Sequence, residues 1–184
     1  MANTAIFMAH GTEECEALLI VDLLRRANIS ITMVSIEDSP EITGAHQIRI
    51  VCDETLEEFT PSDEEYLILP GGGQGTERLK GNNELLNLLQ EHSRQGKPLA
   101  AICAAPTVLA KAGLLDGHTA TCFPGCENEF GPGVRYTPDR LVEDGSVLTG
   151  QALGSAIPFA LKLIENLRNR QTADTIAERI HYQN

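Results

Sequence analysis

Short runs of aliphatic residues, each followed by a stretch with helical spacing, constrain the fold of this chain most strongly. The strand-like runs lie at residues 4–9, 30–36, 66–69 and 99–102. Apolar residues at helical spacing cover residues 13–27, 84–95 and 155–167, with a shorter helical segment at 172–180. Strands that are apolar throughout are typical of a parallel sheet covered by helices. We therefore expect an α/β fold: a flavodoxin-like three-layer sandwich, with a mainly parallel sheet and helices on both faces.

One part of the chain departs from this parallel pattern. Asp144 and Gly145 stand between short apolar segments at residues 141–142 and 147–149, which is a typical hairpin signal. We expect this hairpin to add an antiparallel strand to the sheet. The chain has 184 residues, of which 42% are hydrophobic and only 4% aromatic. One domain spanning residues 1–184, with a mostly aliphatic core, is therefore expected.

Charge and hydropathy exclude several kinds of partner. The formal net charge is −12, from 26 acidic and 14 basic residues. This balance repels nucleic-acid phosphates and anionic lipid surfaces, so neither nucleic acid nor a membrane is expected as a partner. The first ten residues lack the charged segment and long apolar stretch of a signal peptide, and no run is long enough to span a membrane. We expect a cytoplasmic location.

The cysteines are dispersed and odd in number: Cys15, Cys52, Cys103, Cys122 and Cys126. Without an export signal or a CxxC pair, a disulfide framework is not expected. Cys122 and Cys126 are close enough in sequence to share a metal or to form a reversible disulfide. No second Cys/His pair lies nearby to complete a tetrahedral zinc site, so no metal is predicted.

Cys103 stands where a strand turns into a helix. It follows the apolar run at 99–102, and Pro106 can occupy the first helical turn. Small neighbours such as Ala104 allow a sharp backbone turn, as glycines do around a serine nucleophile elbow. This turn would place Cys103 at the carboxyl end of the sheet, where open α/β sheets bind ligands, and the following helix would favour its thiolate. The alternative is a small buried cysteine that fills space at a strand end.

Glu16 is an unusual residue within the first predicted helix. Helical spacing aligns it with Ile20 and Ala27, on the apolar stripe that should face the sheet. A carboxyl there would be partly desolvated and its pKa raised, so it could donate a hydrogen bond to a thiolate or move a proton. A salt bridge at the edge of the stripe is the alternative.

Glycines directly follow the apolar run at 66–69. Residues 69–76 read Leu-Pro-Gly-Gly-Gly-Gln-Gly-Thr, which matches neither a P-loop nor the G-x-G-x-x-G pattern. Glycines at this point allow close approach of the backbone, and their N–H groups could hold an oxyanion. A plain tight turn would explain them equally well.

Together these segments resemble the ThiJ/PfpI superfamily, also called the DJ-one family, and most closely its YajL-like bacterial branch. The resemblance covers nearly the whole chain, and the combination of Glu16, Gly71-Gly72 and Cys103 in this order carries it. The supporting segments are Glu13-Glu-Cys-Glu-Ala17, Asp22-Leu-Leu-Arg-Arg-Ala27, Ala100-Ala-Ile-Cys-Ala-Ala-Pro-Thr107, Val142-Glu-Asp-Gly145 and Leu148-Thr149. Membership implies a flavodoxin-like fold, a homodimer and a site without a cofactor.

The resemblance also implies roles for individual residues. Cys103 is then the nucleophile and the oxidation-sensitive thiol, and Glu16 is its protonated hydrogen-bond partner. Backbone N–H groups of Gly72 and Ala104 would form an oxyanion hole. The remaining expected substrate-binding or interface residues are Gly71, Arg26, His46 and Phe123, of which Arg26 matches an arginine placed near the site and the dimer interface.

Several positions depart from the usual family pattern. Phe123 stands where many relatives have a histidine, and His46 stands where an arginine is common, which would weaken anion binding. Residues 150–154 read Gly-Gln-Ala-Leu-Gly in place of a more usual Ser-Arg-Gly-Pro-Gly, which alters the wall of the site. Ala104 occupies the position of the histidine that follows the cysteine in the protease-like branch, so peptidase activity is not expected.

Two classes of function remain open. One is an enzyme acting on small α-oxoaldehydes or their adducts, of glyoxalase III or deglycase type, which converts methylglyoxal to lactate by means of Cys103 and Glu16. The other is a non-enzymatic redox sensor or chaperone of the oxidative stress response. Cys126 would resolve an oxidised Cys103 if its loop folds back over the site, whereas Cys15 is expected to pack in the interior and His10 to be an ordinary strand-end residue.

Overall fold

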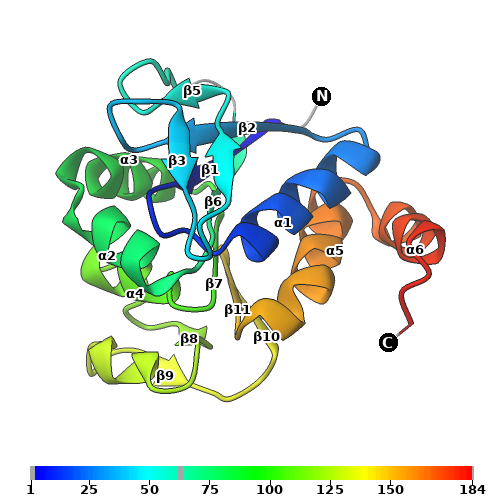
Figure 1. Cartoon of the computed structure of the whole chain (residues 1–184). Coiled ribbons are helices and arrows are strands. Elements are labelled where there is room, and N and C mark those ends of the chain that lie inside the picture. Colours follow the sequence, from blue (N-terminus) through cyan, green and yellow to red (C-terminus); the bar gives the residue numbers. More distant parts are fainter. Residues whose placement is uncertain (1–2, 62–63, 184) are drawn as a thin grey trace.

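The computed structural model describes residues 3–61 and 64–183, and a central sheet dominates these ranges (Figure 1). Its strands are β1 (Asn3–Met8), β2 (Ser30–Ser35), β5 (Glu54–Thr55), β6 (Glu64–Leu69), β7 (Leu99–Ile102), β10 (Leu141–Asp144) and β11 (Val147–Gly150). They lie in the order β10-β11-β7-β6-β1-β2-β5. All neighbouring strands are parallel except the β10–β11 hairpin. The predicted mainly parallel sheet with one antiparallel addition is confirmed.

Helices cover both faces of this sheet (Figure 1). One layer contains α1 (Glu14–Arg26) and α5 (Ala156–Leu167), with α6 (Arg170–Arg179) packed against α5. The other contains α2 (Gly73–Gly81), α3 (Asn83–Arg94) and α4 (Pro106–Lys111). The three-layer arrangement expected from the sequence is therefore confirmed. No helix in the described ranges is long and apolar enough to cross a membrane.

The alternation of side chains along each strand explains why the strands are apolar throughout. In β1, Ile6 and Met8 pack in the core beneath α1 and α5, while Ala5 and Phe7 pack beneath α2, α3 and α4. All four side chains are fully buried. A strand segment covered on both faces is mostly apolar, because successive side chains point to opposite layers.

Short elements lie at the carboxyl edge of the sheet. Two small two-stranded sheets pair β3 (Glu41–Thr43) with β4 (Arg49–Val51), and β8 (Thr119–Ala120) with β9 (Arg135–Tyr136). Two 3₁₀ turns, η1 (Cys126–Glu129) and η2 (Leu153–Ser155), follow β8 and β11 respectively. These segments surround the ends of the central strands, where the candidate site lies.

Candidate active site

The predicted site residues come from the carboxyl ends of neighbouring strands. Cys103 directly follows β7, and Gly71 follows β6 after a single proline. The register that pairs Leu69 with Ala101 brings these two strand ends side by side. Helix α1 begins beyond the end of β1, the other neighbour of β6, and carries Glu16 in its first turn. The topology therefore brings together three positions far apart in sequence, as open parallel sheets do at their ligand sites.

Cys103 has the backbone conformation of a nucleophile elbow. Its φ is 66°, in the left-handed region that costs a residue with a side chain about 1 kcal/mol. Its N–H donates to the carbonyl of Gly150 at 2.9 Å, and its carbonyl accepts from the N–H of Phe123 at 2.7 Å. These two bonds hold the strained turn in place, so the predicted sharp turn at Cys103 is confirmed.

Glu16 is held against Cys103 in the interior. Its side chain is only 1% exposed, and its Oε2 accepts a hydrogen bond from the N–H of Gly71 at 2.9 Å. The carboxyl also shares a hydrogen bond with the Cys103 thiol. A Cβ added to Gly71 would lie 2.4 Å from Glu16 Oε2 and 2.5 Å from the Cys103 Cβ, so only glycine fits between them. Glu16 therefore takes part in this pair rather than in a salt bridge at the edge of the stripe.

Burial and proximity shift the ionisation of both groups. Burial raises the pKa of Glu16 from its ordinary 4.5 to about 7, although hydrogen bonds with Cys103 and Gly71 oppose the rise. Burial also raises the pKa of the Cys103 thiol to about 12, and the Glu16 carboxylate adds to the increase. The pair therefore loses its first proton near pH 7 and keeps the second well into the alkaline range.

The expected acidification of Cys103 by the following helix is wrong. Helix α4 has only six residues and begins at Pro106, three positions beyond the thiol, so its N-terminus contributes little. Desolvation outweighs the N–H groups of Ala104 and Gly72, which lower the thiol pKa. The repulsion from Glu16 disappears when Glu16 carries the proton, because the carboxyl then donates to the sulfur. Activation thus depends on which of the two groups holds their shared proton.

The two predicted oxyanion donors both point to the reactive sulfur. The backbone N–H groups of Gly72 and Ala104 form hydrogen bonds with Cys103. Gly72 has a φ of 101°, and a Cβ there would lie 2.3 Å from the carbonyl oxygen of Gly11. The glycine-rich segment at residues 69–76 forms a shorter loop than expected, because helix α2 already begins at Gly73. The helix starts at once because Gly72 makes the required turn.

A cavity of about 380 Å³ opens over this pair. It is lined by Glu13, Glu16, Gly72, Gly73, Cys103, Ala104, Phe123, Cys126, Ala152, Leu153 and Gly154. Its size falls within the range of small-molecule sites. The predicted contribution of the loop at 150–154 to the wall is confirmed by three of its residues. Glu13 was not predicted as a site residue, although it lines the cavity and its charge raises the pKa of Glu16.

Two other predicted site residues lie apart from the thiol. Arg26 is at the far end of α1 and pairs with Asp22 at 2.5 Å. His46 contacts Glu14, with Nδ1 3.1 Å from its Oε2 and the backbone N–H 2.7 Å from its Oε1. The hydrogen bond to Glu14 and the charge of Glu13 raise the pKa of His46. Neither Arg26 nor His46 lines the cavity, so a role for them at an interface stays a prediction.

The possible metal ligands in the described ranges form one cluster, of which only Glu13 lines the cavity. Glu13, Glu14 and His46 offer one ligand atom each, all within 4.8 Å of one another. Glu14 is buried and already accepts hydrogen bonds from the backbone N–H groups of His46 and Ile48. These bonds account for the buried carboxylate without an ion.

The remaining cysteines differ in their surroundings, and all five thiols are free. Cys126 lines the Cys103 cavity, and its N–H donates to the carbonyl of Phe123 at 2.9 Å. Cys122 is fully buried. Cys15 is exposed, so its expected packing role is wrong: the helix turns it away from the buried face that carries Glu16.

His10 is a structural residue. Its Nδ1 accepts from the N–H of Thr43 at 2.9 Å, and its own N–H donates to Glu37 at 3.0 Å. These bonds join the end of β1 to β3 and to the segment that follows β2. The expectation of an ordinary strand-end histidine is confirmed.

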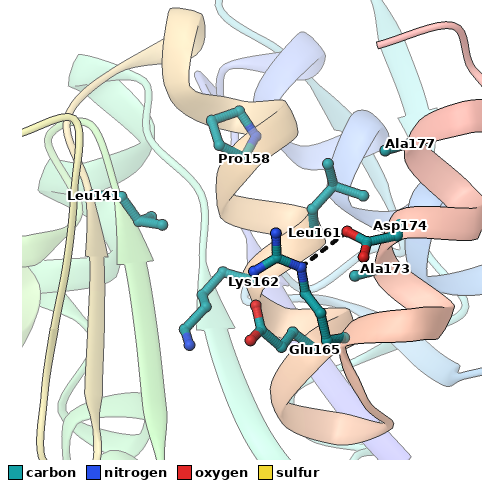
Figure 2. A pocket seen from close by; sticks show the side chains of 9 residues that line it. Leu141, Pro158, Leu161, Lys162, Glu165, Ala173, Asp174 and Ala177 are labelled. Atoms are coloured by element: carbon teal, nitrogen blue, oxygen red, sulfur yellow. Dashed lines mark hydrogen bonds and ion pairs between the residues drawn. The ribbon is translucent and has the colours of Figure 1, made fainter. Parts of the chain in front are cut away.

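A second cavity, of about 170 Å³, lies between α5, α6 and β10 (Figure 2). Its walls combine apolar residues such as Leu161 with charged residues, most of which are in ion pairs. Arg170 pairs with Asp174 at 2.9 Å, and Lys162 pairs with Glu143 at 3.0 Å. Its lining residues include no thiol and no histidine. Of these two cavities, the one above Cys103 is therefore the candidate for chemistry.

Comparison with known proteins agrees with this geometry. A model of the DJ-1/PfpI family matches residues 2–166. The chain is 31% identical over 177 residues to Protein dj-1beta of Drosophila melanogaster, covering 96% of this chain and 95% of that protein. It is 30% identical over 128 residues to a deglycase of Pyrococcus abyssi, covering 69% and 76%. The structure of oxidized Toxoplasma gondii DJ-1 superposes with a TM-score of 0.95 at 34% identity over both entire chains. The chain thus belongs to the DJ-1/PfpI family.

Proposed function

We propose that this protein is a cofactor-independent enzyme that acts on small α-oxoaldehydes or their adducts, of glyoxalase III or deglycase type. The buried Glu16 carboxyl in hydrogen-bond contact with Cys103 carries the proposal, because it supplies a nucleophile and a proton carrier within one cavity. The similarity to a deglycase of Pyrococcus abyssi supports the substrate class.

The first chemical step forms a carbon–sulfur bond. Glu16 takes the thiol proton, and the Cys103 sulfur attacks the aldehyde carbon of the substrate. The N–H groups of Gly72 and Ala104 can stabilise the negative charge that forms on the substrate oxygen. Glu16 then gives the thiol proton to this oxygen, so the hemithioacetal is neutral and Glu16 is a carboxylate again. Strain at Cys103 presents the sulfur to the cavity before the substrate arrives.

The next steps move a proton between adjacent carbons. Glu16 removes the proton from the carbon that carries the sulfur and returns it to the former ketone carbon. The hydroxyl proton of the hemithioacetal passes to the former ketone oxygen, which gives a thioester of a 2-hydroxy acid. The aldehyde carbon is oxidised and the ketone carbon is reduced, so no external oxidant is required. Water then hydrolyses the thioester and releases the free thiol with the 2-hydroxy acid. A carboxyl whose pKa is about 7 suits both proton transfers near neutral pH.

Lactate formation from methylglyoxal tests this proposal. Cys103→Ala should abolish turnover, whereas Cys15→Ala removes an exposed thiol from the same region and should leave kcat/KM within about twofold. Equal rates for the wild type and Cys103→Ala would overturn the proposal.

Cys126 favours redox sensing as a second candidate function, because this thiol shares the cavity with Cys103. Peroxide would convert the Cys103 thiolate to a sulfenic acid, which condenses with the Cys126 thiol to a disulfide and releases water. The similarity to an oxidized DJ-1 structure supports this reading. Mild peroxide should lower the intact mass by about 2 Da in the wild type, whereas Cys126→Ser should gain about 32 Da on Cys103. A gain of about 32 Da in both proteins would exclude Cys126 as the resolving thiol.

We also propose that the protein forms a homodimer, in keeping with the family resemblance. Ile48 and Val51 lie on the β3–β4 hairpin and expose large apolar side chains, Val51 with 64% of its surface accessible. Exposed apolar groups gathered on one segment are typical of interfaces. Light scattering of the purified protein measures the mass directly.

A further inference from the structure

The cavity above Cys103 has an unusual chemical lining. Its charged residues are two carboxyl groups, Glu13 and Glu16, and no lysine, arginine or histidine is among its described lining residues. The like charge of Glu13 already raises the pKa of Glu16. An anionic substrate would add a further negative charge at short range, and the described lining residues include no cationic side chain that would compensate for it. This electrostatic environment favours a neutral substrate.

Part of the cavity wall is apolar and open to solvent. Phe123 is 48% exposed and Leu153 is 45% exposed, although both are large hydrophobic residues. Ala152 completes this part of the wall. We call Phe123, Ala152 and Leu153 the apolar wall. A bound group that covers these side chains removes apolar surface from water, which is the main source of affinity in small-molecule sites.

Hydrogen bonds fix the apolar wall in position on both sides. The N–H of Phe123 donates to the carbonyl of Cys103 at 2.7 Å, so the aromatic residue is tied directly to the nucleophile. On the other side, the N–H of Ser155 donates to the carbonyl of Ala152 at 2.7 Å, and the Arg140 guanidinium donates to the carbonyl of Gly154 at 2.5 Å. A wall held by the backbone binds a ligand at a lower ordering cost than a mobile one.

The cavity is also much larger than the smallest substrates. Methylglyoxal has five non-hydrogen atoms and would occupy only a small part of about 380 Å³. It would leave the apolar wall uncovered while its two carbonyl carbons lie at Cys103. A substrate with a larger apolar substituent would place the same dicarbonyl group at the sulfur and cover Phe123 and Leu153 at the same time.

We propose that this site selects neutral 2-oxoaldehydes that carry an aryl or branched alkyl substituent, and that Phe123 and Leu153 are its specificity-determining residues. This inference rests on the proposed function, because it names the substrate class of the same site. The reaction consumes one water molecule and converts an aryl glyoxal to the corresponding 2-hydroxy-2-arylacetate, with the aldehyde carbon oxidised and the ketone carbon reduced.

Three 2-oxoaldehydes test the proposal by turnover: methylglyoxal, phenylglyoxal and 4-carboxyphenylglyoxal. In the wild type, kcat/KM for phenylglyoxal should exceed that for either of the others by about tenfold, which corresponds to about 1.4 kcal/mol. Phe123→Ser and Leu153→Ser should lower the phenylglyoxal-to-methylglyoxal ratio by about tenfold, whereas Phe123→Leu keeps an apolar side chain and should retain most of it. Equal ratios in the wild type and both serine variants would overturn the proposal.

A second measurement does not depend on turnover. Alkylation of Cys103 by N-phenylmaleimide and by N-ethylmaleimide compares an aryl with a small alkyl reagent, and peptide mapping separates Cys103 from Cys126. Each alkylation rate is divided by the rate of the same reagent with free cysteine. The corrected rate for N-phenylmaleimide should exceed that for N-ethylmaleimide by about tenfold in the wild type, and the two should be nearly equal in Phe123→Ser. Faster labelling by N-phenylmaleimide without any aldehyde turnover would refute the proposed enzymatic function but would support recognition of aryl groups by the apolar wall. Unselective labelling in the wild type would refute the recognition, whatever the turnover.

Discussion

Replacing Glu16 by glutamine should stabilise the protein at neutral pH while it removes the proton carrier. Burial raises the pKa of Glu16 from 4.5 to about 7, so the folded state binds this proton more tightly than the unfolded chain does. Between these two values the folded state holds more protons, and stability falls as the pH rises. A rise of this size corresponds to about 3 kcal/mol of stability lost above pH 7.

Glutamine avoids this cost and keeps the local hydrogen bonds. Its amide oxygen can still accept from the N–H of Gly71, which now lies 2.9 Å from Glu16, and its amide N–H can donate to the Cys103 sulfur. Below pH 4.5 the two proteins should therefore differ little from each other. Above pH 7, Glu16→Gln should be more stable than the wild type by about 3 kcal/mol, and it should lose aldehyde turnover.

Urea unfolding under reducing conditions, at several pH values between 4 and 8, measures this difference. Glu58→Gln is a control that should destabilise the protein at neutral pH, whereas Glu16→Gln should stabilise it. Hydrogen bonds from the N–H and hydroxyl of Thr55 lower the pKa of the exposed Glu58 carboxyl. Glu58 therefore stabilises the fold at neutral pH, and this contribution is lost as the pH falls through its lowered pKa. A stability difference between Glu16→Gln and the wild type that does not change with pH would refute the reasoning.

Three further predictions concern the neighbourhood of the site and the proposed dimer. Gly71→Ala should abolish Cys103 alkylation and destabilise the fold by about 1–3 kcal/mol, because the added Cβ would clash with Glu16 and Cys103. Gly73→Ala is the control: its Cβ would meet nothing within 4 Å, so this variant should retain alkylation. Cys103→Gly should be more stable than Cys103→Ala by about 1 kcal/mol in urea unfolding, because glycine adopts a φ of 66° without strain; equal stabilities would contradict the strain. Val51→Asp should give a monomer by light scattering and Tyr136→Asp should not; a dimer in both would place the interface elsewhere.

Much of the fold could be predicted from the sequence, because its strongest signals are local. The apolar run at 99–102 became β7 residue for residue, and the run at 66–69 became the last four residues of β6, because strand segments covered on both faces are mostly apolar. Helix α2 could not be predicted in the same way. It begins at Gly73 within a glycine-rich segment of low helix propensity, and contacts with the rest of the protein determine it.

The candidate site was predictable in its members but not in its electrostatics. Sequence spacing placed Cys103 at a strand end and Glu16 on the buried face of a helix. The pKa of the thiol depends on burial and on the distance to Glu16, neither of which a sequence pattern contains. Glu13 was missed as part of the cavity wall for the same reason, because the wall is formed by segments that meet only in three dimensions. Cys126 was expected there only if its loop folds back over Cys103, and it does line the cavity.

The rate of Cys103 alkylation as a function of pH tests most directly whether Cys103 and Glu16 act as a pair. If they share one proton, the rate in the wild type should rise with an apparent pKa near 7, where the pair loses its first proton. In Glu16→Gln this rise near pH 7 should disappear. A wild-type profile that rises only in the range of an ordinary or buried thiol, or one that Glu16→Gln leaves unchanged, would contradict the account.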